Sequence, residues 1–399
     1  QRWIERQTGK MSLPPSLTKL DPGDAITFPV GSHDVTGRLT VLSLGAQRDS
    51  EFNAFDPGIF SFPNQPDDER LPGVGAIYGA ATVVFMDLPL FTGQELFPWA
   101  PRIAALADPW PGAVSVYRQL ADSTYEFSVR HGYRNGMGEL LSPLPSGPIG
   151  VWDRGNTLHV KLDYGALSST TELSALEAAL ALGVYNAAED EWEIVQFATA
   201  TLQPDGSYFV TDLLRGQFGT EKAMGDPVPT GSLVVVLEPA FLSALTVTDE
   251  LVAENLTYSW GPSRYPQSDD TYQNGTFQGK RTGLRPYSPV NVRMQVNGAG
   301  DLILTWIRRT RFGGDGWTVS EIPLNEESEQ YRLRIYDGST IVREVVTTEP
   351  TYTYSAADQA TDFGAAQSSL KLDVAQYGAA YGDYGTLRDG TYNIESAVP

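Results

Sequence analysis

Apolar and polar residues alternate in short runs over most of the chain, which is the period of a strand with one buried face. Tyr125–Val129 and Leu158–Leu162 alternate most clearly. Ala81–Asp87 is apolar enough to predict a buried strand, and Pro204-Asp205-Gly206 predicts a hairpin turn. Further strands are predicted at residues 25–28, 37–42, 114–117, 192–197 and 207–210.

One segment has the helical period instead. Its apolar positions are Leu173, Leu176, Ala179 and Leu180. They predict a helix over residues 171–182, with Ser169 or Thr170 as its N-cap and Gly183 at its end.

The last hundred or so residues have a pattern of their own. Alternating apolar positions predict seven or so strands between Val290 and Val374, with Trp306 in the second strand and an Asp337-Gly338 turn. This number of short strands around a central tryptophan is what a β-sandwich requires. The order of strands and turns resembles a fibronectin type III domain.

The 39 Gly and 27 Pro leave little room for long helices. We therefore predict a mainly β, multidomain chain, with small barrel-like or sandwich domains followed by the fibronectin type III-like sandwich. The predicted boundaries are 1–145, 146–283 with the one helix, and 284–399. Residues 1–8 are expected to form a short helix, residues 50–78 a long loop and residues 262–284 a connection.

A net charge of −21 makes free nucleic acid a poor partner. The absence of cysteine excludes disulfides and thiolate chemistry. No apolar run reaches 18 residues, and Leu233–Leu237 is only strand-sized. The chain begins at Gln1 without Met, so we expect a processed product, a trimmed chain or the C-terminal part of a longer one.

The three histidines His33, His131 and His159 lie far apart in the sequence. His33 is expected in an exposed turn and His159 on the polar face of a strand. No Gly-x-Ser-x-Gly motif accompanies them, so a serine triad has little support. We expect no catalytic residue and no enzyme.

Acidic clusters offer two further kinds of site. Asp67-Asp68-Glu69 and Glu189-Asp190-Glu191 contain the carboxylates that a glycosidase would pair, but we expect solvated loops because the chain has 49 acidic residues. Asp205 and Asp269-Asp270 offer oxygens to calcium without the spaced pattern of a calcium loop. We therefore expect neither a bound metal nor a cofactor.

Two groups of residues are candidate binding or interface positions: the arginines Arg308, Arg309 and Arg311, and the tyrosines Tyr377, Tyr381 and Tyr384. The arginines could contact an acidic neighbouring subunit or an anionic lipopolysaccharide. Pairing within the domain, with Glu326, Glu327 and Glu329, is the favoured interpretation. The tyrosines, expected to be exposed, could stack on sugars or pack between subunits.

Seven strings occur in one order along the chain. They are Leu13-Pro14-Pro15-Ser16 with Leu20-Asp21-Pro22-Gly23-Asp24, Asp108-Pro109-Trp110-Pro111-Gly112, Trp152-Asp153-Arg154-Gly155, residues 192–197, Leu213–Glu221, Leu284–Val290 and Trp306–Arg311. Together they resemble the C-terminal part of the tail-tip host-specificity ("megatron" or hub) protein of alphaproteobacterial gene transfer agents and related siphophages. The TIM-barrel-like region and upstream hub segments of that family have no counterpart in this sequence.

The resemblance implies a structural component of the tail tip, located in the virion at the distal end of the tail. It implies a homotrimer that contacts the distal tail ring, the upstream hub segment, a fibre and the host outer-membrane surface or its glycans. Its function would be tail assembly and host attachment or genome delivery. The alternative is a free-standing carbohydrate-binding adhesin, or the binding module of a cell-wall-degrading enzyme.

Overall fold

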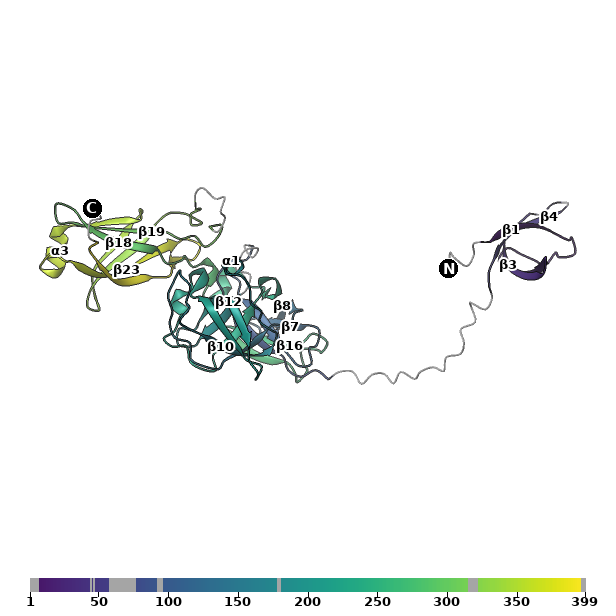
Figure 1. Cartoon of the computed structure of the whole chain (residues 1–399), viewed down its shortest axis with the longest axis horizontal. Helices are drawn as coiled ribbons and strands as arrows, with labels where there is room; N and C mark the ends of the chain where they lie inside the picture. The colour runs from purple at the N-terminus through teal and green to yellow at the C-terminus, as the bar shows by residue number, and fades with distance from the viewer. Residues whose placement is uncertain are drawn as a thin grey trace. The chain divides into compact units, whose positions relative to one another are not determined.

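The structure is a computed structural model that describes residues 7–43, 45, 47–56, 77–91, 96–177, 181–314 and 322–395. The chain divides into two units, Gln1–Gly75 and Ala76–Pro399, and each is described by itself. The regular secondary structure of both is mainly antiparallel strands, so the predicted mainly β class is confirmed (Figure 1).

The first unit contains one four-stranded sheet in the order β1-β4-β3-β2. Its strands are β1 (Thr8–Leu13), β2 (Ala25–Val30), β3 (His33–Leu42) and β4 (Arg48–Ala54). Phe52 lies over the sheet with its ring 4.7 Å from that of Phe28. The predicted loop over 50–78 is wrong at its start, because residues up to Ala54 pair with β1 and β3. Most of the predicted N-terminal helix and residues 57–76 lie outside the described residues, and Thr8 belongs to β1.

A closed six-stranded barrel lies in the second unit, in the order β10-β13-β12-β11-β14-β9 (Figure 1). Its strands are β9 (Met137–Leu140), β10 (Leu158–Tyr164), β11 (Ala181–Asn186), β12 (Glu191–Leu202), β13 (Tyr208–Leu214) and β14 (Leu233–Leu237). Side chains on one face of each strand fill the barrel, among them Leu182, Val195 and Phe197. Closure leaves no free sheet edge along this ring of strands.

Two smaller sheets accompany the barrel, in the orders β15-β6-β5 and β17-β16-β7-β8. Their strands are β5 (Thr82–Met86), β6 (Arg102–Leu106), β7 (Val114–Gln119), β8 (Tyr125–His131), β15 (Ser243–Ala244), β16 (Leu256–Pro262) and β17 (Gln273–Phe277). Met86 and Ala104 pack with Trp192 and Ile194 from the outer face of β12. Because β12 is covered on both faces, its first eight residues are all buried.

The structure does not follow the boundary predicted between residues 145 and 146. β9 pairs with β10 and β14 to close the barrel, and β7 pairs with β16. These pairs join strands from either side of that boundary. The predicted connection over 262–284 also contains β17 and the short 3₁₀ helix η5 (Thr282–Leu284). Alternation within a strand gives its face but not its partner, which is why sequence patterning missed these pairs.

The predicted helix over 171–182 is too long. α1 spans Glu172–Leu176, and Thr171, not Ser169 or Thr170, caps it by accepting a hydrogen bond from the Ser174 amide. Ala181 already belongs to β11, and Gly183 lies inside that strand instead of ending a helix. The other short helices are α2 (Asp249–Val252), η2 (Gln217–Gly219), η3 (Glu221–Ala223) and η4 (Pro239–Phe241).

The C-terminal domain is a sandwich of the fibronectin type III kind, as predicted. One sheet has the order β18-β19-β22 and the other the order β21-β20-β23, with β24 and β25 also paired to β23. The elements are β18 (Val290–Val296), β19 (Leu302–Ile307), β20 (Tyr331–Asp337), β21 (Thr340–Thr347), β22 (Thr351–Tyr354), α3 (Ala356–Phe363), β23 (Ser369–Gly378), β24 (Asp383–Tyr384) and β25 (Arg388–Asn393). Trp306 on β19 is buried against Tyr331, their ring centroids 5.3 Å apart.

Candidate functional site

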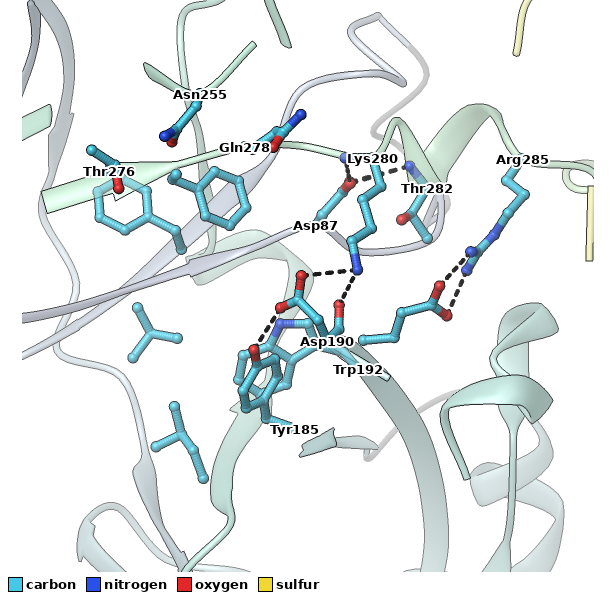
Figure 2. A pocket seen from close by; sticks show the side chains of 15 residues that line it. Asp87, Tyr185, Asp190, Trp192, Asn255, Thr276, Gln278, Lys280, Thr282 and Arg285 are labelled. Carbon is cyan, nitrogen blue, oxygen red and sulfur yellow. Dashed lines mark hydrogen bonds and ion pairs between the residues drawn. The ribbon is translucent and has the colours of Figure 1, made fainter. Parts of the chain in front are cut away.

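A pocket of about 410 Å³ lies where β5, β12 and the segment following β17 meet (Figure 2). Its apolar wall includes Phe85, Trp192 and Phe277. The ring of Phe85 stacks on that of Phe277 with 5.5 Å between centroids. The lining also includes the charged side chains of Asp87, Asp190, Glu191, Lys280 and Arg285, so the pocket combines apolar and charged groups.

Lys280 and Asp190 lie together among these charged groups. The Lys280 ammonium lies 2.9 Å from a carboxylate oxygen of Asp190 and 2.6 Å from its carbonyl oxygen. The Tyr185 hydroxyl donates to the same carboxylate at 2.6 Å (Figure 2). Burial and the Asp190 carboxylate raise the pKa of Tyr185 to about 12, whereas the Tyr185 hydrogen bond and Lys280 lower the pKa of Asp190. The lowered pKa favours the ionised form of the Asp190 carboxylate.

Asp87, immediately after β5, holds the residues at the start of η5 in place. Its carboxylate accepts hydrogen bonds from the backbone amides of Lys280 and Thr282. Burial raises the pKa of Asp87, and these two amides oppose that rise. The contact anchors the segment that leads from the barrel region to the C-terminal domain.

Arg285 lies at the edge of this pocket and also lines a second one. Its guanidinium donates two hydrogen bonds to Glu191, at 2.7 and 3.1 Å (Figure 2). The second pocket has a volume of about 230 Å³. It is lined by Lys222, Arg285, Arg332, Tyr381, Tyr384, Gly385, Thr386 and Leu387. Arg285 thus lies between two hollows, and the second of them is lined by residues of both the barrel region and the C-terminal domain.

The three arginines of the predicted cluster are engaged separately. Arg308 lies 3.8 Å from Glu329, and Arg311 lies 2.8 Å from Glu326. Both contacts agree with the favoured interpretation of pairing within the domain. Arg309 instead reaches the barrel region, where it lies 2.5 Å from the Glu221 carboxylate. It also donates to the Ser288 carbonyl oxygen at 2.8 Å.

The candidate tyrosines are half-buried, not exposed as expected. The rings of Tyr377 and Tyr384 contact each other edge to face, 5.4 Å between centroids. Tyr381 and Tyr384 both line the second pocket, which Tyr377 does not. Two of the three predicted positions therefore belong to one hollow, together with cations that sequence patterning did not connect with them.

A separate group of charges is buried in the barrel. Arg215, fully buried, lies 2.6 Å from Glu193 and 3.5 Å from Asp153. It also donates to the Pro145 carbonyl oxygen at 2.8 Å. Asp153 and Arg215 come from two of the strings that carry the family resemblance, and Glu193 comes from a third. Three of these strings therefore contribute to one buried ionic group in the barrel.

The histidines lie apart in the structure as in the sequence. His33 is exposed, as predicted, but it begins β3 instead of lying in a turn, and half-buried His159 is 2.9 Å from the Ser207 hydroxyl. His131 is fully buried between Ser243 at 2.8 Å and Asn135 at 2.7 Å. This order resembles a Ser-His-Asn arrangement, but the Asn135 side chain also binds the Ala105 amide and the Phe241 carbonyl oxygen. We interpret these side chains as a buried hydrogen-bond network that connects neighbouring segments of the chain.

The acidic clusters are mostly accounted for by local contacts. Asp205 and Asp269 each accept hydrogen bonds from the residue two positions later, Ser207 and Thr271. Glu191 is buried and paired instead of solvated as predicted, and Asp67-Asp68-Glu69 lies outside the described residues. Within the described ranges, no three His, Asp or Glu side chains gather as a metal site, and no helix is long and apolar enough to cross a membrane.

Sequence patterning missed Lys222, Lys280, Arg285 and Arg332 as site residues. Arg285 stood within a string of the family resemblance, which was the one available signal. The others come from segments more than fifty residues apart, and nothing local marks them as neighbours. Only the tertiary fold brings them together.

These features define a mainly β, multidomain protein with a closed barrel and a fibronectin type III-like domain joined by charged contacts. Residues 135–235, which include all six barrel strands apart from the last two residues of β14, match the family described as Rcc01698-like, C-terminal. No curated protein matches the chain.

Two solved structures are similar at low identity. The FN1–FN3 domains of chicken CNTN1 are 13% identical, with 64% of this chain and 68% of that chain covered, at a TM-score of 0.20. The BSP domain of a biofilm associated protein is 9% identical, with 98% and 74% covered, at a TM-score of 0.18. At TM-scores this low, the superpositions support no inference about function.

Proposed function

We propose that this chain is a structural component of the tail tip of a phage-like gene transfer particle, and that it works through assembly and binding, without turnover. The observation that carries the proposal is the Rcc01698-like match over residues 135–235. Rcc01698 is a Rhodobacter capsulatus gene associated with a gene transfer agent. The match covers the barrel, which includes the buried Arg215 group.

The way the barrel meets the C-terminal domain supports a mechanical role. Arg285 and Arg309 bring two guanidinium groups to Glu191 and Glu221. Charged contacts that are largely shielded from water are stronger than surface pairs, because screening by solvent is weak there. A firmly docked pair of domains suits a component that transmits position and force along a tail tip.

The exposed apolar residues around α1 supply an assembly face for the proposed trimer. Leu173 and Leu176 on α1 are 61% and 58% exposed, and Val151 is 57% exposed. Arg154 binds Glu172 at 2.6 Å and lies over the Trp152 ring, so this loop and α1 lie together. Apolar groups gathered in this way are typical of contact surfaces.

The direct test is to locate the chain on purified particles. A fusion tag on the C-terminal domain should give density at the distal tip of the tail, with threefold symmetry, in averaged electron micrographs. A Leu173→Glu, Leu176→Glu variant should prevent incorporation, whereas Val346→Glu, at another exposed apolar position, should not. Density on the capsid, or a monomeric chain that binds a glycan and is absent from particles, would overturn the proposal.

A further inference from the structure

The pocket formed by Lys222, Arg285 and Arg332 has a charge opposite to that of the chain as a whole. The chain carries a net charge of −21. Three cationic side chains nevertheless line this pocket, and no carboxylate is among its lining residues. In a strongly acidic protein, such a hollow is a local positive site that favours an anion.

Two of the three cations already have carboxylate partners. Arg285 is bound by Glu191 through two hydrogen bonds, which fix its orientation. Lys222 lies 3.6 Å from Glu189, and its side chain is 57% exposed. The long, exposed lysine side chain is free to turn toward a ligand.

Arg332 differs from Arg334 and Arg308 in its partners. Arg334, on the same strand, is paired with Asp373 at 3.0 Å, and Arg308 lies near Glu329. Arg332 has no carboxylate partner among the described residues, and its buried Nε atom has no hydrogen-bond acceptor there. A buried donor without an acceptor is costly, which makes this guanidinium the natural contact for an incoming oxyanion.

The tyrosines position Arg332 and supply apolar surface. The guanidinium lies over the Tyr384 ring, 4.4 Å from its centroid. The Tyr384 hydroxyl accepts a hydrogen bond from Gln330 at 3.0 Å, so its own proton remains available to donate. Tyr381 and Leu387 complete the wall. Cations for a charged group and flat rings for a sugar face are thus side by side.

The volume limits the size of the ligand. At about 230 Å³ the pocket is smaller than the sites that hold drug-sized molecules. It suits one charged sugar residue and not a long oligosaccharide in full. A longer glycan would enter by a terminal or branching unit.

We propose that this pocket binds a phosphorylated monosaccharide unit, with the phosphate held by Arg332 and Lys222 and the sugar ring against Tyr381 and Tyr384. The proposal goes beyond the tail-tip function, because assembly of a tail tip requires no such ligand. Since Lys222 belongs to η3 and Arg332 to β20, a bound ligand also bridges the barrel region and the C-terminal domain.

Isothermal titration calorimetry on the full chain tests the site with three probes: glucose 6-phosphate, inorganic phosphate and glucose. Glucose 6-phosphate should bind most tightly and inorganic phosphate more weakly, and glucose should give no measurable heat. Arg332→Gln should weaken glucose 6-phosphate binding by about tenfold or more, since it removes a charge-assisted hydrogen bond. Arg130→Gln, an exposed arginine on β8 outside the pocket, is the matched control and should bind as the unaltered chain does.

Three results would overturn the proposal: no binding of glucose 6-phosphate, equal binding of glucose, or equal affinity in the Arg332→Gln chain. Inorganic phosphate binding as tightly as glucose 6-phosphate would overturn the role of the sugar and its tyrosines. Should Arg332→Gln fail to give the circular dichroism of the folded chain, Lys222→Gln replaces it, because Lys222 is exposed and is expected to weaken binding severalfold. None of these outcomes depends on where the chain lies in a particle, so the tail-tip proposal is tested separately.

Discussion

The guanidinium of Arg285 and the carboxylate of Glu191 form two parallel hydrogen bonds, 2.7 and 3.1 Å long, between residues 94 positions apart. Both side chains are largely buried, with 12% and 9% exposure. Glu191 begins β12 of the barrel, and Arg285 follows η5 and lies five residues before β18, the first strand of the C-terminal domain. The pair therefore connects the barrel with the start of the sandwich.

Replacing Arg285 by Met should loosen this connection. The change leaves the Glu191 carboxylate buried without its cation, which costs about 3 kcal/mol in comparable buried pairs. We expect the free energy of unfolding to fall by about this amount in urea titrations. Proteolysis should also become faster between residues 278 and 290.

Glu126→Gln, which removes the partner of Arg118 in an exposed pair, should change the free energy of unfolding by less than about 1 kcal/mol. Equal losses in both variants would contradict a special role for Arg285.

The Glu191 carboxylate should make stability depend on pH in a predictable direction. Burial raises its pKa, but the hydrogen bonds and charge of Arg285 outweigh burial and hold the pKa below the ordinary value of 4.5. A carboxylate with a lowered pKa stabilises the folded state above its unfolded pKa, and this contribution is lost as pH falls through the folded value. The Glu191→Gln chain should therefore be less stable than the unaltered chain at pH 7, and the difference should shrink below pH 4.5.

Urea titrations of both chains between pH 3 and pH 7 measure this difference. Asp87 and Glu326, whose pKa values burial raises, act in the opposite direction, but they are present in both chains and cancel in the comparison. A difference that stayed constant down to pH 3 would contradict the assignment.

The buried Arg215 group should matter most for the barrel itself. Arg215→Met removes the cation shared by Glu193 and Asp153 and leaves two carboxylates with 0% and 3% exposure. We expect a loss of about 3–5 kcal/mol in unfolding free energy, by urea titration. Replacing Glu193 by Gln in the same chain should recover part of that loss, because one of the stranded charges is gone. A single replacement costing less than 1 kcal/mol would show that the group is not structural.

The sequence predicted many individual strands, although not β6, β9, β11 or β16, and it did not predict how the strands associate. Alternation around Leu302, Leu304 and Trp306 indicated a buried face, and the structure confirms it. The same kind of alternation in the barrel strands could not reveal that β9 pairs with β14, almost a hundred residues later in the chain, and so closes the barrel. Register and partner depend on contacts that no local window contains.

The helix prediction failed for a related physical reason. Leu173, Leu176, Ala179 and Leu180 have helical spacing, yet Leu173 and Leu176 are largely exposed and Ala181 starts β11. Helical spacing indicates a buried stripe only if something covers that stripe, and propensity yields to the sheet when strand pairing competes for the same residues.

The candidate site was predicted only in fragments. Tyr381 and Tyr384 were singled out as aromatics between glycines, and Arg309 as part of a basic cluster. Their cationic neighbours Lys222 and Arg332 carried no local signal, because Arg332 differs from Arg334 on the same strand by having no acidic partner in the described structure. A missing contact is a tertiary property, which no pattern of residue types records.

Any side chain introduced at Gly219 should push the barrel region and the C-terminal domain apart. It has a φ of +77°, and a Cβ atom there would come within 3 Å of three atoms of the Tyr287 ring. Gly206 has a similar φ of +81° but open space around it, so it is the matched control. Gly206→Ala should cost about 1 kcal/mol through backbone strain alone. Gly219→Ala should cost clearly more, because the Tyr287 ring must move as well. Thermal unfolding of the two variants measures the difference, and Tyr287→Ala added to Gly219→Ala should remove most of the excess. Equal destabilisation by the two alanine variants would mean that Tyr287 yields without cost and that the close approach to Gly219 does not hold the two regions together.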